Sequence, residues 1–518
     1  MTASKNLSAL LKKIEIARWD YITSSRSRTL IAADLVQLSL RKYELCNFRT
    51  AVGDVFGHDL MKGKYGDDFK SAESRLMYRH LKHNAPSRTS VVRELMRSAE
   101  TIKAWEFARE ENDFSIAAPH LERSIEAERD AAKYSRDHLL WEDYKAQPEL
   151  PIDVAMDKKS EDFRPRHIIA WGEDLIPFCQ GMLAKQKMFQ ATQRYLHDDA
   201  FHMPADKQEK LLRGLLTKLG YDDTRGKIAP SPHPICLGRN DDVRIGYTID
   251  ENNFLNTLLS TAHEAGHAFY RQNLPQEHKD ELCGDVAGNI VDEAMALLFE
   301  NHVMRTKAGA QLIYDMVSRE VGEPYKSRLN PQMIYKHMDK LEPHGTRAKA
   351  DDVRYPLDIM HRFGMVKDLY SGEVRADDLK SAWNKRYEDM TGIAPKDDRY
   401  GILQDVHLFG GEAAWLTTYL PGRLAAAQLA EACVADCPDV GKAIALYGGF
   451  DRDLSNLEPF KEWLRENICQ EGARLRPFDL LQSATGQALS TQAYMAHVKD
   501  RYAPPRMPVV ATQMGCAL

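Results

Sequence analysis

The sequence predicts an all-α fold, a predominantly helical single body with a small β element near residues 240–250. Apolar residues recur at helical spacing along most of the 518-residue chain, punctuated by Pro and Gly. The clearest alternation of apolar and polar residues, typical of a strand, occupies 243–249. The length alone would allow two to four domains, but no Gly/Ser or Pro tract separates two halves. We therefore expect one body.

The N-terminal half divides into successive helical segments. Residues 5–45 predict a long helix or a helical hairpin, and 70–145 predict several helices with charged pairs at i,i+4 spacing. Two further helices are expected over 167–220, and Gly220 gives the second of them a C-cap signal. The Pro-rich segment that follows leads into the predicted strand.

Helices resume after the strand and dominate the rest of the chain. They are expected over 251–340, then from about 357 to 390 after an irregular stretch. The segment 401–415 is rich in polar groups and Gly, so we expect a loop there. Helices return to about residue 500, and 501–518 is expected to be an extended or disordered tail.

One of these helices carries a pattern with chemical meaning. In T-A-H-E-A-G-H, the residues His263, Glu264 and His267 form an H-E-x-x-H motif. Positions i and i+4 share one helix face, so both imidazoles can bind one metal ion. Glu264 then lies close enough to take a proton from a metal-bound water. The motif predicts a metal-dependent hydrolase.

The surrounding helix supports this interpretation over a chance match in a helix that binds nothing. Apolar residues recur at helical spacing from Phe254 to Phe269, and Asp250 is the expected N-cap. Gly266 inside a helix costs up to about 1 kcal/mol relative to Ala. We therefore expect a neighbouring backbone or a substrate to approach closely at Gly266.

The next predicted helix, 284–306, supplies the third ligand. Catalytic zinc commonly has three protein ligands and one open position. Glu293 is the expected ligand, and its rivals are Asp292, Glu300 and His302. Glu300 follows Glu293 by seven residues and shares its face, so it is expected to orient an imidazole.

Composition excludes several classes of protein. The net charge is −6, with 28% charged residues of both signs and no basic stripe, which argues against nucleic-acid binding. No run of 18 apolar residues predicts a membrane span, and the N-terminus has no apolar signal segment. The eight cysteines are scattered, and the single close pair, Cys433 and Cys437, has no second pair to complete a zinc knuckle. We expect a cytoplasmic enzyme.

Several ordered motifs resemble one family over residues from about 7 to 500. The chain resembles the H-E-x-x-H metallocarboxypeptidases of the carboxypeptidase Taq (thermostable carboxypeptidase 1) family. The motifs that carry the resemblance are His233–Pro234, D-V-R-I at 242–245, H-E-A-G-H at 263–267, Glu293, R-A-K-A-D at 347–351 and G-I-L-Q-D-V-H at 401–407.

The resemblance implies an almost entirely α-helical fold with a long groove containing the metal site, commonly as a homodimer. It implies a catalytic domain over 1–500, with 501–518 as an unmatched tail. The implied activity is removal of single amino acids from peptide C-termini with Zn²⁺ or Co²⁺; Mn²⁺ also accepts two His and a carboxylate. His263, His267 and Glu293 would bind the metal, and Glu264 would be the general base.

Other residues at matching positions would act on the substrate. Arg347 would grip a substrate carboxylate; its alternative is a structural ion pair with Asp351 or Asp352. His407 and Tyr419 would polarise the carbonyl or stabilise the oxyanion. The remaining substrate-binding residues expected at matching positions are His233, Arg244 and Gln404, of which His233 and Arg244 could equally be hydrogen-bond donors that stabilise loops.

The chain departs from the family pattern in its substrate elements. Where the family has His-Glu-Ser-Gln, this chain has Asp292-Glu293-Ala294-Met295, so Asp292 and Met295 are expected to alter substrate contacts. Further replacements are Ile235 for Phe, Gly246 for Thr and Leu408 for Trp. An alternative function is therefore hydrolysis or rearrangement of a small carboxylated metabolite, such as an N-acyl or sugar–amino-acid conjugate. A binding protein on an inactive scaffold is a third possibility, and retention of Glu264 argues against it.

Overall fold

The computed structural model describes residues 88–138, 151–190, 198–341, 347, 350–410, 413–438, 454 and 456–502, together with isolated positions between 9 and 76. Almost all of the helix or hairpin expected over 5–45 and of the tail expected over 501–518 lies outside the described residues.

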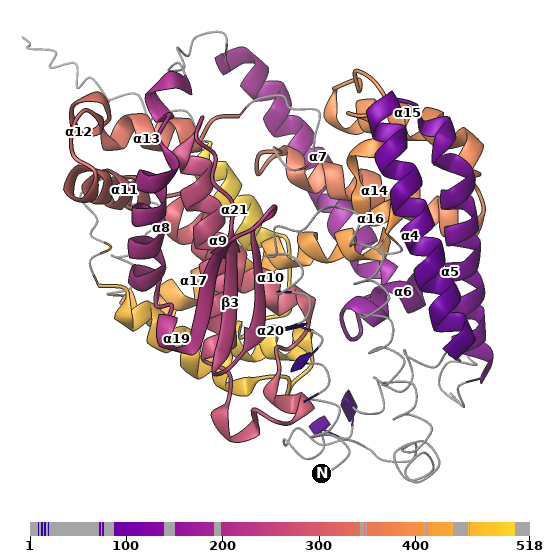
Figure 1. Ribbon diagram of the computed structural model, residues 1–518, viewed down its shortest axis with the longest axis horizontal. Helices are drawn as coiled ribbons and strands as arrows, with labels where there is room; N and C mark the ends of the chain where they lie inside the picture. Colours follow the sequence, from indigo (N-terminus) through magenta and orange to yellow (C-terminus); the bar gives the residue numbers. More distant parts are fainter. Residues whose placement is uncertain are drawn as a thin grey trace, which may run out of the picture.

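The described chain is a predominantly helical body with one small sheet, as the sequence predicts (Figure 1). Before the sheet come α4 (Arg88–Glu111), α5 (Ala118–His138), α6 (Pro151–Lys159), α7 (Pro165–Gln190) and α8 (Ala205–Leu219). After it come α9 (Phe254–Gln272), α10 (Asn289–Leu297), α11 (Lys307–Glu320), α12 (Tyr325–Arg328), α13 (Pro331–Met338), α14 (Arg354–Ser371), α15 (Leu379–Thr391), α16 (Val406–Phe409), α17 (Tyr419–Asp436), α19 (Glu458–Asn467), α20 (Pro477–Thr485) and α21 (Gln492–Arg501).

Helix α8 ends where its sequence indicates. Gly220 adopts the left-handed conformation with φ 97°, and its N–H donates to carbonyls of the last turn. A residue with a Cβ is strained there, which explains the C-cap signal. One face of α8 is buried through Leu211, Leu212, Leu215, Leu216 and Leu219.

The sheet has three strands in the order β1-β3-β2. The predicted strand is the central one, β3 (Asp242–Tyr247); it runs parallel to β1 (Gly226–Pro230) and antiparallel to β2 (Ile235–Arg239). The two outer strands were not expected, because the prolines between them favour turns. Pro230 is tolerated because it ends an edge strand, where its missing N–H breaks no central ladder bond.

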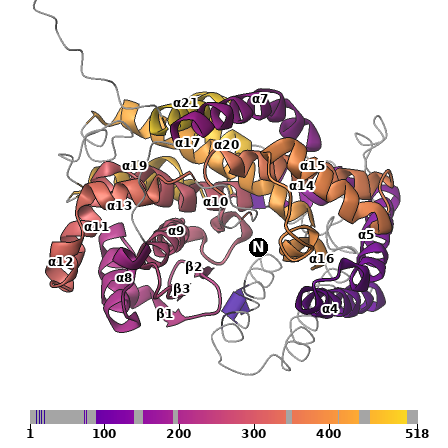
Figure 2. The same ribbon diagram turned by 90° about the horizontal axis from the view of Figure 1, so that it is seen from above.

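Helix α9 lies between the sheet and the helices that complete the metal centre. One side of α9 packs against β2 and β3, and the other against α10, which in turn packs against α17. Figure 2 shows this order, with the sheet at one side and α17 at the other. The motif of the sequence is thus placed in the middle of the packed body.

The start of α9 differs from the prediction. Asn253, not Asp250, is the N-cap, and its side chain accepts a hydrogen bond from the N–H of Leu255 at 3.1 Å. Asp250 instead accepts from the N–H of Asn252 at 3.1 Å and from the side chain of Asn256 at 2.9 Å. The expectation for Asp250 was wrong because its carboxylate closes the turn that precedes the helix.

The segment expected as a loop over 401–415 contains short helical turns. A 3₁₀ turn covers Ile402–Gln404, and α16 follows at Val406–Phe409. Asp405 caps α16 through the N–H of His407. Pieces this short lack the repeat that a periodicity argument needs.

Candidate metal centre

The three predicted metal ligands converge on one point. Nε2 of His263 lies 3.8 Å from Oε1 of Glu293, and Nε2 of His267 lies 3.9 Å from Oε2 of the same carboxylate. One ligand atom from each residue lies within 4.8 Å of the others. These separations are too long for hydrogen bonds. They are close to the roughly 3.3–3.6 Å between donors around one tetrahedral zinc with bonds of about 2.0–2.2 Å.

The far nitrogen of each imidazole is held by a second carboxylate. Nδ1 of His263 lies 3.1 Å from Oε2 of Glu300, and Nδ1 of His267 lies 3.1 Å from Oδ1 of Asp292. A carboxylate at Nδ1 fixes the ring orientation and leaves Nε2 as the coordinating atom. The residues present therefore fit a divalent metal ion.

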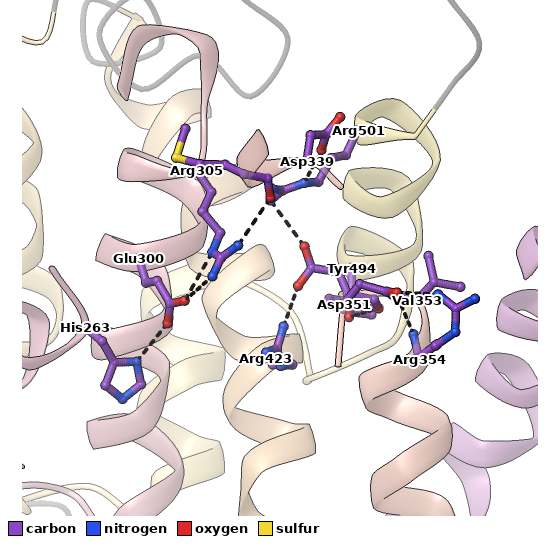
Figure 3. A network of polar contacts seen from close by, with 12 residues as sticks. His263, Glu300, Arg305, Asp339, Asp351, Val353, Arg354, Arg423, Tyr494 and Arg501 are labelled. Carbon is purple, nitrogen blue, oxygen red and sulfur yellow. Dashed lines mark hydrogen bonds and ion pairs between the residues drawn. The ribbon is translucent and has the colours of Figure 1, made fainter. Parts of the chain in front are cut away.

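Each of these carboxylates is in turn held by an arginine. Arg305 donates through Nε to Oε1 of Glu300 at 3.1 Å, and Arg271 donates through Nη2 to Oδ2 of Asp292 at 2.8 Å. Figure 3 shows His263, Glu300 and Arg305 in line. Both imidazoles thus share one construction: histidine, carboxylate, arginine.

Two glycines let the three helices of the centre approach. A Cβ on Gly266 of α9 would lie 2.5 Å from the carbonyl oxygen of Met295 in α10. A Cβ on Gly422 of α17 would lie 2.8 Å from Cγ of Glu293. The first contact confirms the close approach expected at Gly266. Because neither glycine has a side chain, Glu293 can lie close to the imidazoles and to α17.

Negative charge dominates the electrostatics of the site. Burial lowers the pKa of His263, but Glu293, Glu300 and Glu264 outweigh it and raise that pKa to about 10. Burial raises the pKa of Glu300, but the hydrogen bond from His263 and the charge of Arg305 bring it down to about 2. A bound cation would be stabilised by the same carboxylates and would displace the imidazole protons.

The expected general base lies beside the ligands. Glu264 follows His263 in α9 and is 6% exposed. Burial raises the pKa of its carboxyl above the usual 4.5, against the lowering effect of both imidazoles. A carboxylate with a raised pKa is a better proton acceptor at neutral pH.

The rival third ligands have other partners. Asp292 and Glu300 hold imidazoles from behind, as described above. His302 is buried and packs against His497, with ring centroids 4.3 Å apart. Of the four acidic and histidine side chains weighed on this stretch, Glu293 is the one that faces both Nε2 atoms.

The guanidinium of Arg347 lies among aromatic side chains and pairs with neither Asp351 nor Asp352. Its guanidinium donates to the hydroxyl of Tyr355 at 3.3 Å and stacks over the ring of Tyr419, 5.2 Å from the centroid. Asp351 pairs with Arg354, and Asp352 pairs with Arg423 at 2.6 Å and Arg501 at 3.2 Å. The structure therefore does not support the alternative of a structural ion pair for Arg347.

Gln404 positions the backbone of this arginine. Its Oε1 accepts from the N–H of Arg347 at 3.0 Å, and its Nε2 donates to the carbonyl of Tyr400 at 2.9 Å. Both functional ends of the Gln404 amide have protein partners.

His407 lies beside a buried carboxylate, and Tyr419 keeps its proton, as a donor requires. Nδ1 of His407 lies 3.4 Å from Oδ1 of Asp405, whose other oxygen accepts from Arg362 at 2.6 Å. Burial, followed by the charge of Glu293, raises the pKa of Tyr419 above its usual 10, so the phenol keeps its proton at neutral pH. Tyr419 precedes Gly422 by three residues in α17, one turn from the contact with Glu293.

Two residues expected to contact the substrate are buried. The Met295 side chain is fully buried in the core, and its helix packs against α9 there. Asp292 is 8% exposed, and its two oxygens are taken by His267 and Arg271. Sequence position beside a ligand does not mean exposure to substrate, because neighbours on a helix point in different directions.

The two remaining residues lie in the sheet region. Arg244 on β3 donates to both carboxylate oxygens of Asp242, at 2.8 and 2.9 Å. Both residues belong to β3, so this contact holds the guanidinium along the strand. His233 is exposed in the turn between β1 and β2, where its carbonyl accepts from the Ser231 hydroxyl.

Sequence reasoning missed both supporting arginines and Tyr355. Arg271 follows His267 by four residues, so the helical face that carries both imidazoles could have indicated it. Arg305 could not be found this way, because the π-helical stretch Leu298–Met304 precedes it and changes the spacing. Tyr355 meets Arg347 only through the fold.

A second group of metal-binding residue types lies in the loop between α9 and α10. His278, Glu281 and Cys283 place donor atoms within 4.8 Å of one another. Nδ1 of His278 bonds the Glu281 carboxylate at 2.8 Å, so these donors are satisfied by one another.

Among the described helices, none combines the length and the apolarity that crossing a bilayer requires.

A helical scaffold with two histidines and a glutamate around one point, and a buried glutamate beside them, defines a metal-dependent hydrolase. Residues 22–502 match the model of the carboxypeptidase Taq (M32) metallopeptidase family, and the chain belongs to this family. It is thus a metallocarboxypeptidase, which removes C-terminal residues and uses a divalent metal.

Named relatives agree with this assignment. The chain is 29% identical to carboxypeptidase 1 of Bacillus subtilis (strain 168) over 410 residues, covering 79% of this chain and 77% of the relative. It is 30% identical to thermostable carboxypeptidase 1 of Pyrococcus furiosus over 409 residues, 77% of each chain. The solved structure of Pyrococcus furiosus carboxypeptidase superposes with a TM-score of 0.84 at 25% identity over 97% of both chains. Trypanosoma cruzi metallocarboxypeptidase 1 shares the fold, with a TM-score of 0.85 at 23% identity, covering 97% of this chain and 98% of that one.

Proposed function

We propose that this metallocarboxypeptidase removes single amino acids from peptide C-termini at a zinc ion held by His263, His267 and Glu293. The observation that carries the proposal is the convergence of both Nε2 atoms on one carboxylate, with each Nδ1 held from behind. Nitrogen and oxygen donors of this number suit zinc, and cobalt or manganese can replace it.

The side chains divide the reaction between them. A divalent ion, when bound, lowers the pKa of a coordinated water and polarises a carbonyl. Glu264 accepts the proton of the attacking water and delivers it to the leaving amine. Tyr419, which keeps its proton at neutral pH, donates to the developing oxyanion, with His407 as a second donor. Arg347 binds the C-terminal carboxylate of the peptide.

The small-metabolite alternative has lost part of its support. It relied on the changed residues of the substrate elements, and two of these, Asp292 and Met295, are buried. Asp292 instead orients His267, so this replacement alters the support of a metal ligand. The peptide substrate of the family is therefore the one we propose.

Peptide digestion tests the proposal directly. Zinc-loaded protein is incubated with short peptides and the products are identified by mass spectrometry, with Glu264→Gln as the control that keeps every metal ligand. We expect stepwise loss of C-terminal residues, reduced about 10²- to 10⁴-fold in the control at equal zinc content. Intact peptides with stoichiometric zinc bound would reject the proposal.

We further propose that the chain forms a homodimer and works in the cytoplasm. The homodimer is what the resemblance to the family implies. Sedimentation velocity tests it, and a monomer of 58.9 kDa would reject it. The location is supported by the free thiols of all six described cysteines, which persist in reducing compartments. Cell fractionation tests it.

A further inference from the structure

A carboxypeptidase must hold its substrate at two points a fixed distance apart. The C-terminal carboxylate is bound at one point, and the scissile carbonyl lies at the metal. The distance between these points decides how many residues leave in one cleavage. This inference rests on the proposed function, in which Arg347 binds the carboxylate and His263, His267 and Glu293 hold the metal.

Helix α17 spans the gap between the two points. Gly422 abuts Glu293 on the metal side. The next residue, Arg423, lies with its guanidinium over the ring of Tyr355, 3.9 Å from the centroid. The hydroxyl of Tyr355 accepts the hydrogen bond from Arg347 at 3.3 Å. Arg423 is therefore one residue from the contact with a metal ligand and one side chain from Arg347.

Arg423 is itself fixed by a buried carboxylate. Nη1 of Arg423 lies 2.6 Å from Oδ1 of Asp352, and their side chains are 11% and 9% exposed. Oδ2 of Asp352 lies 3.2 Å from Nη1 of Arg501 on α21. The carbonyl of Asp352 accepts from the hydroxyl of Tyr494 at 2.5 Å. Because two arginines hold the carboxylate of Asp352 and Tyr494 holds its backbone, the guanidinium of Arg423 has little freedom.

The same network reaches a metal ligand by a second route. Arg501 and Arg305 each donate to the carbonyl of Met338 at 3.3 Å. Arg305 holds Glu300, which holds His263. Figure 3 shows this arc, with His263 and Glu300 at one side and Arg423 pointing into the network from its own helix. Both routes join the metal side to Arg423.

We propose that Arg423 is a positioning residue that fixes the distance between Arg347 and the metal ligands and thereby limits each cleavage to one C-terminal residue. Its guanidinium does this by lying over the ring of Tyr355, 3.9 Å from the centroid, while pairing with Asp352. A lysine keeps the charge but cannot stack in this way.

Substitution Arg423→Lys tests the proposal with the zinc-loaded full chain. Peptides of six to eight residues are digested under initial-rate conditions, and the products are resolved by mass spectrometry. We expect KM to rise about 10- to 100-fold. The substitution displaces Arg347, which then loses hydrogen bonds to the charged carboxylate of the substrate. We also expect dipeptides to appear among the first products, while zinc affinity stays at the wild-type value.

Two controls separate positioning from stability. Arg465→Lys alters an arginine that stacks on Phe269 and pairs with Glu458 and Glu462, away from this network. It should change neither KM nor the products. Urea unfolding of both variants identifies any purely structural effect. If Arg423→Lys lowers stability but releases single residues at wild-type KM, the proposal is wrong.

A milder variant keeps the test decisive if Arg423→Lys does not fold. Tyr355→Phe removes the hydroxyl and keeps the ring under Arg423. It should raise KM through Arg347 with kcat and zinc affinity unchanged, and Tyr314→Phe, on α11, is the matched control. An unchanged KM would overturn the inference.

If wild-type protein releases no residue at all, the proposed function fails and the inference falls with it. If wild type trims peptides and both variants trim identically, the inference alone fails.

Discussion

Each imidazole of the metal centre has its own carboxylate and arginine. His263 is held by Glu300 and Arg305, and His267 by Asp292 and Arg271. Both histidines lie on α9, but Arg271 also lies on α9 whereas Arg305 follows the π-helical stretch after α10. The symmetry is therefore chemical and does not arise from a sequence repeat. Because the carboxylates fix the rings, metal affinity should depend on residues that never touch the metal.

Replacing either supporting carboxylate should weaken metal binding. We expect Asp292→Ala and Glu300→Ala each to reduce zinc affinity about 10- to 100-fold, since the free imidazole loses its orientation and its neutralising partner. Competition with a chromophoric chelator measures the dissociation constant. Asp315→Ala, on the exposed side of α11, is the control. Wild-type affinity in both variants would contradict the role assigned here.

A buried histidine should make the protein sensitive to acid. Burial, followed by the charges of Arg501 and Arg423, lowers the pKa of His497 from 6.5 to about 4. The unfolded chain therefore binds this proton more tightly, and stability that is complete above pH 6.5 is lost as the pH falls toward 4.

The substitution His497→Gln should flatten this dependence. Between pH 6.5 and 4, the variant should lose less free energy of unfolding than the wild type, by up to about 3 kcal/mol. Urea unfolding at a series of pH values measures it, and His202→Gln, at an exposed position, is the control. An identical slope in the His497→Gln variant would disprove the assignment.

At the scale of elements, the metal centre depends on how closely α9, α10 and α17 pack. Gly266 and Gly422 remove the side chains that would separate them. A methyl group at Gly266 would meet the backbone of α10, which cannot rotate away as a side chain can.

The substitution Gly266→Ala should therefore destabilise the protein despite the better helix propensity of alanine. We expect a loss of about 1–3 kcal/mol from overpacking, together with weaker zinc binding as Glu293 moves from the imidazoles. Gly181→Ala in α7 is the matched control, because nothing lies within 4 Å of the added methyl. That control should gain about 0.5–1 kcal/mol. Urea unfolding compares the two, and equal stabilisation would contradict the packing argument.

At the scale of the whole molecule, the candidate metal ligands lie on helices of one continuous body. We propose that residues 1–500 form one catalytic domain. Thermal unfolding should therefore be a single transition, and bound metal should raise its midpoint temperature. Zinc at about 1,000 times its dissociation constant should add about 4 kcal/mol of stability. Calorimetry with and without a chelator measures the midpoint. Two separate transitions, only one of them shifted by zinc, would show two domains.

The sequence by itself determined the class of fold and the chemistry of the ligands. Both depend on local patterns: helical periodicity gives the helices, and the spacing of His263 and His267 gives a shared helix face. The cap at Gly220 and the strand β3 follow for the same reason. Glu293 needed the family pattern as well, because several acidic residues on its helix were chemically equivalent.

The tertiary structure decided which residues stand behind the ligands and which face the substrate. Asp292 and Met295 were expected at the substrate, and packing of α10 against α9 buries both. Arg305 follows a π-helical stretch, and Arg423 meets Tyr355 across two helices. Such contacts depend on helix register and on the approach that glycines allow. The sequence pattern of a single helix contains neither, since both are set by the packing of distant segments.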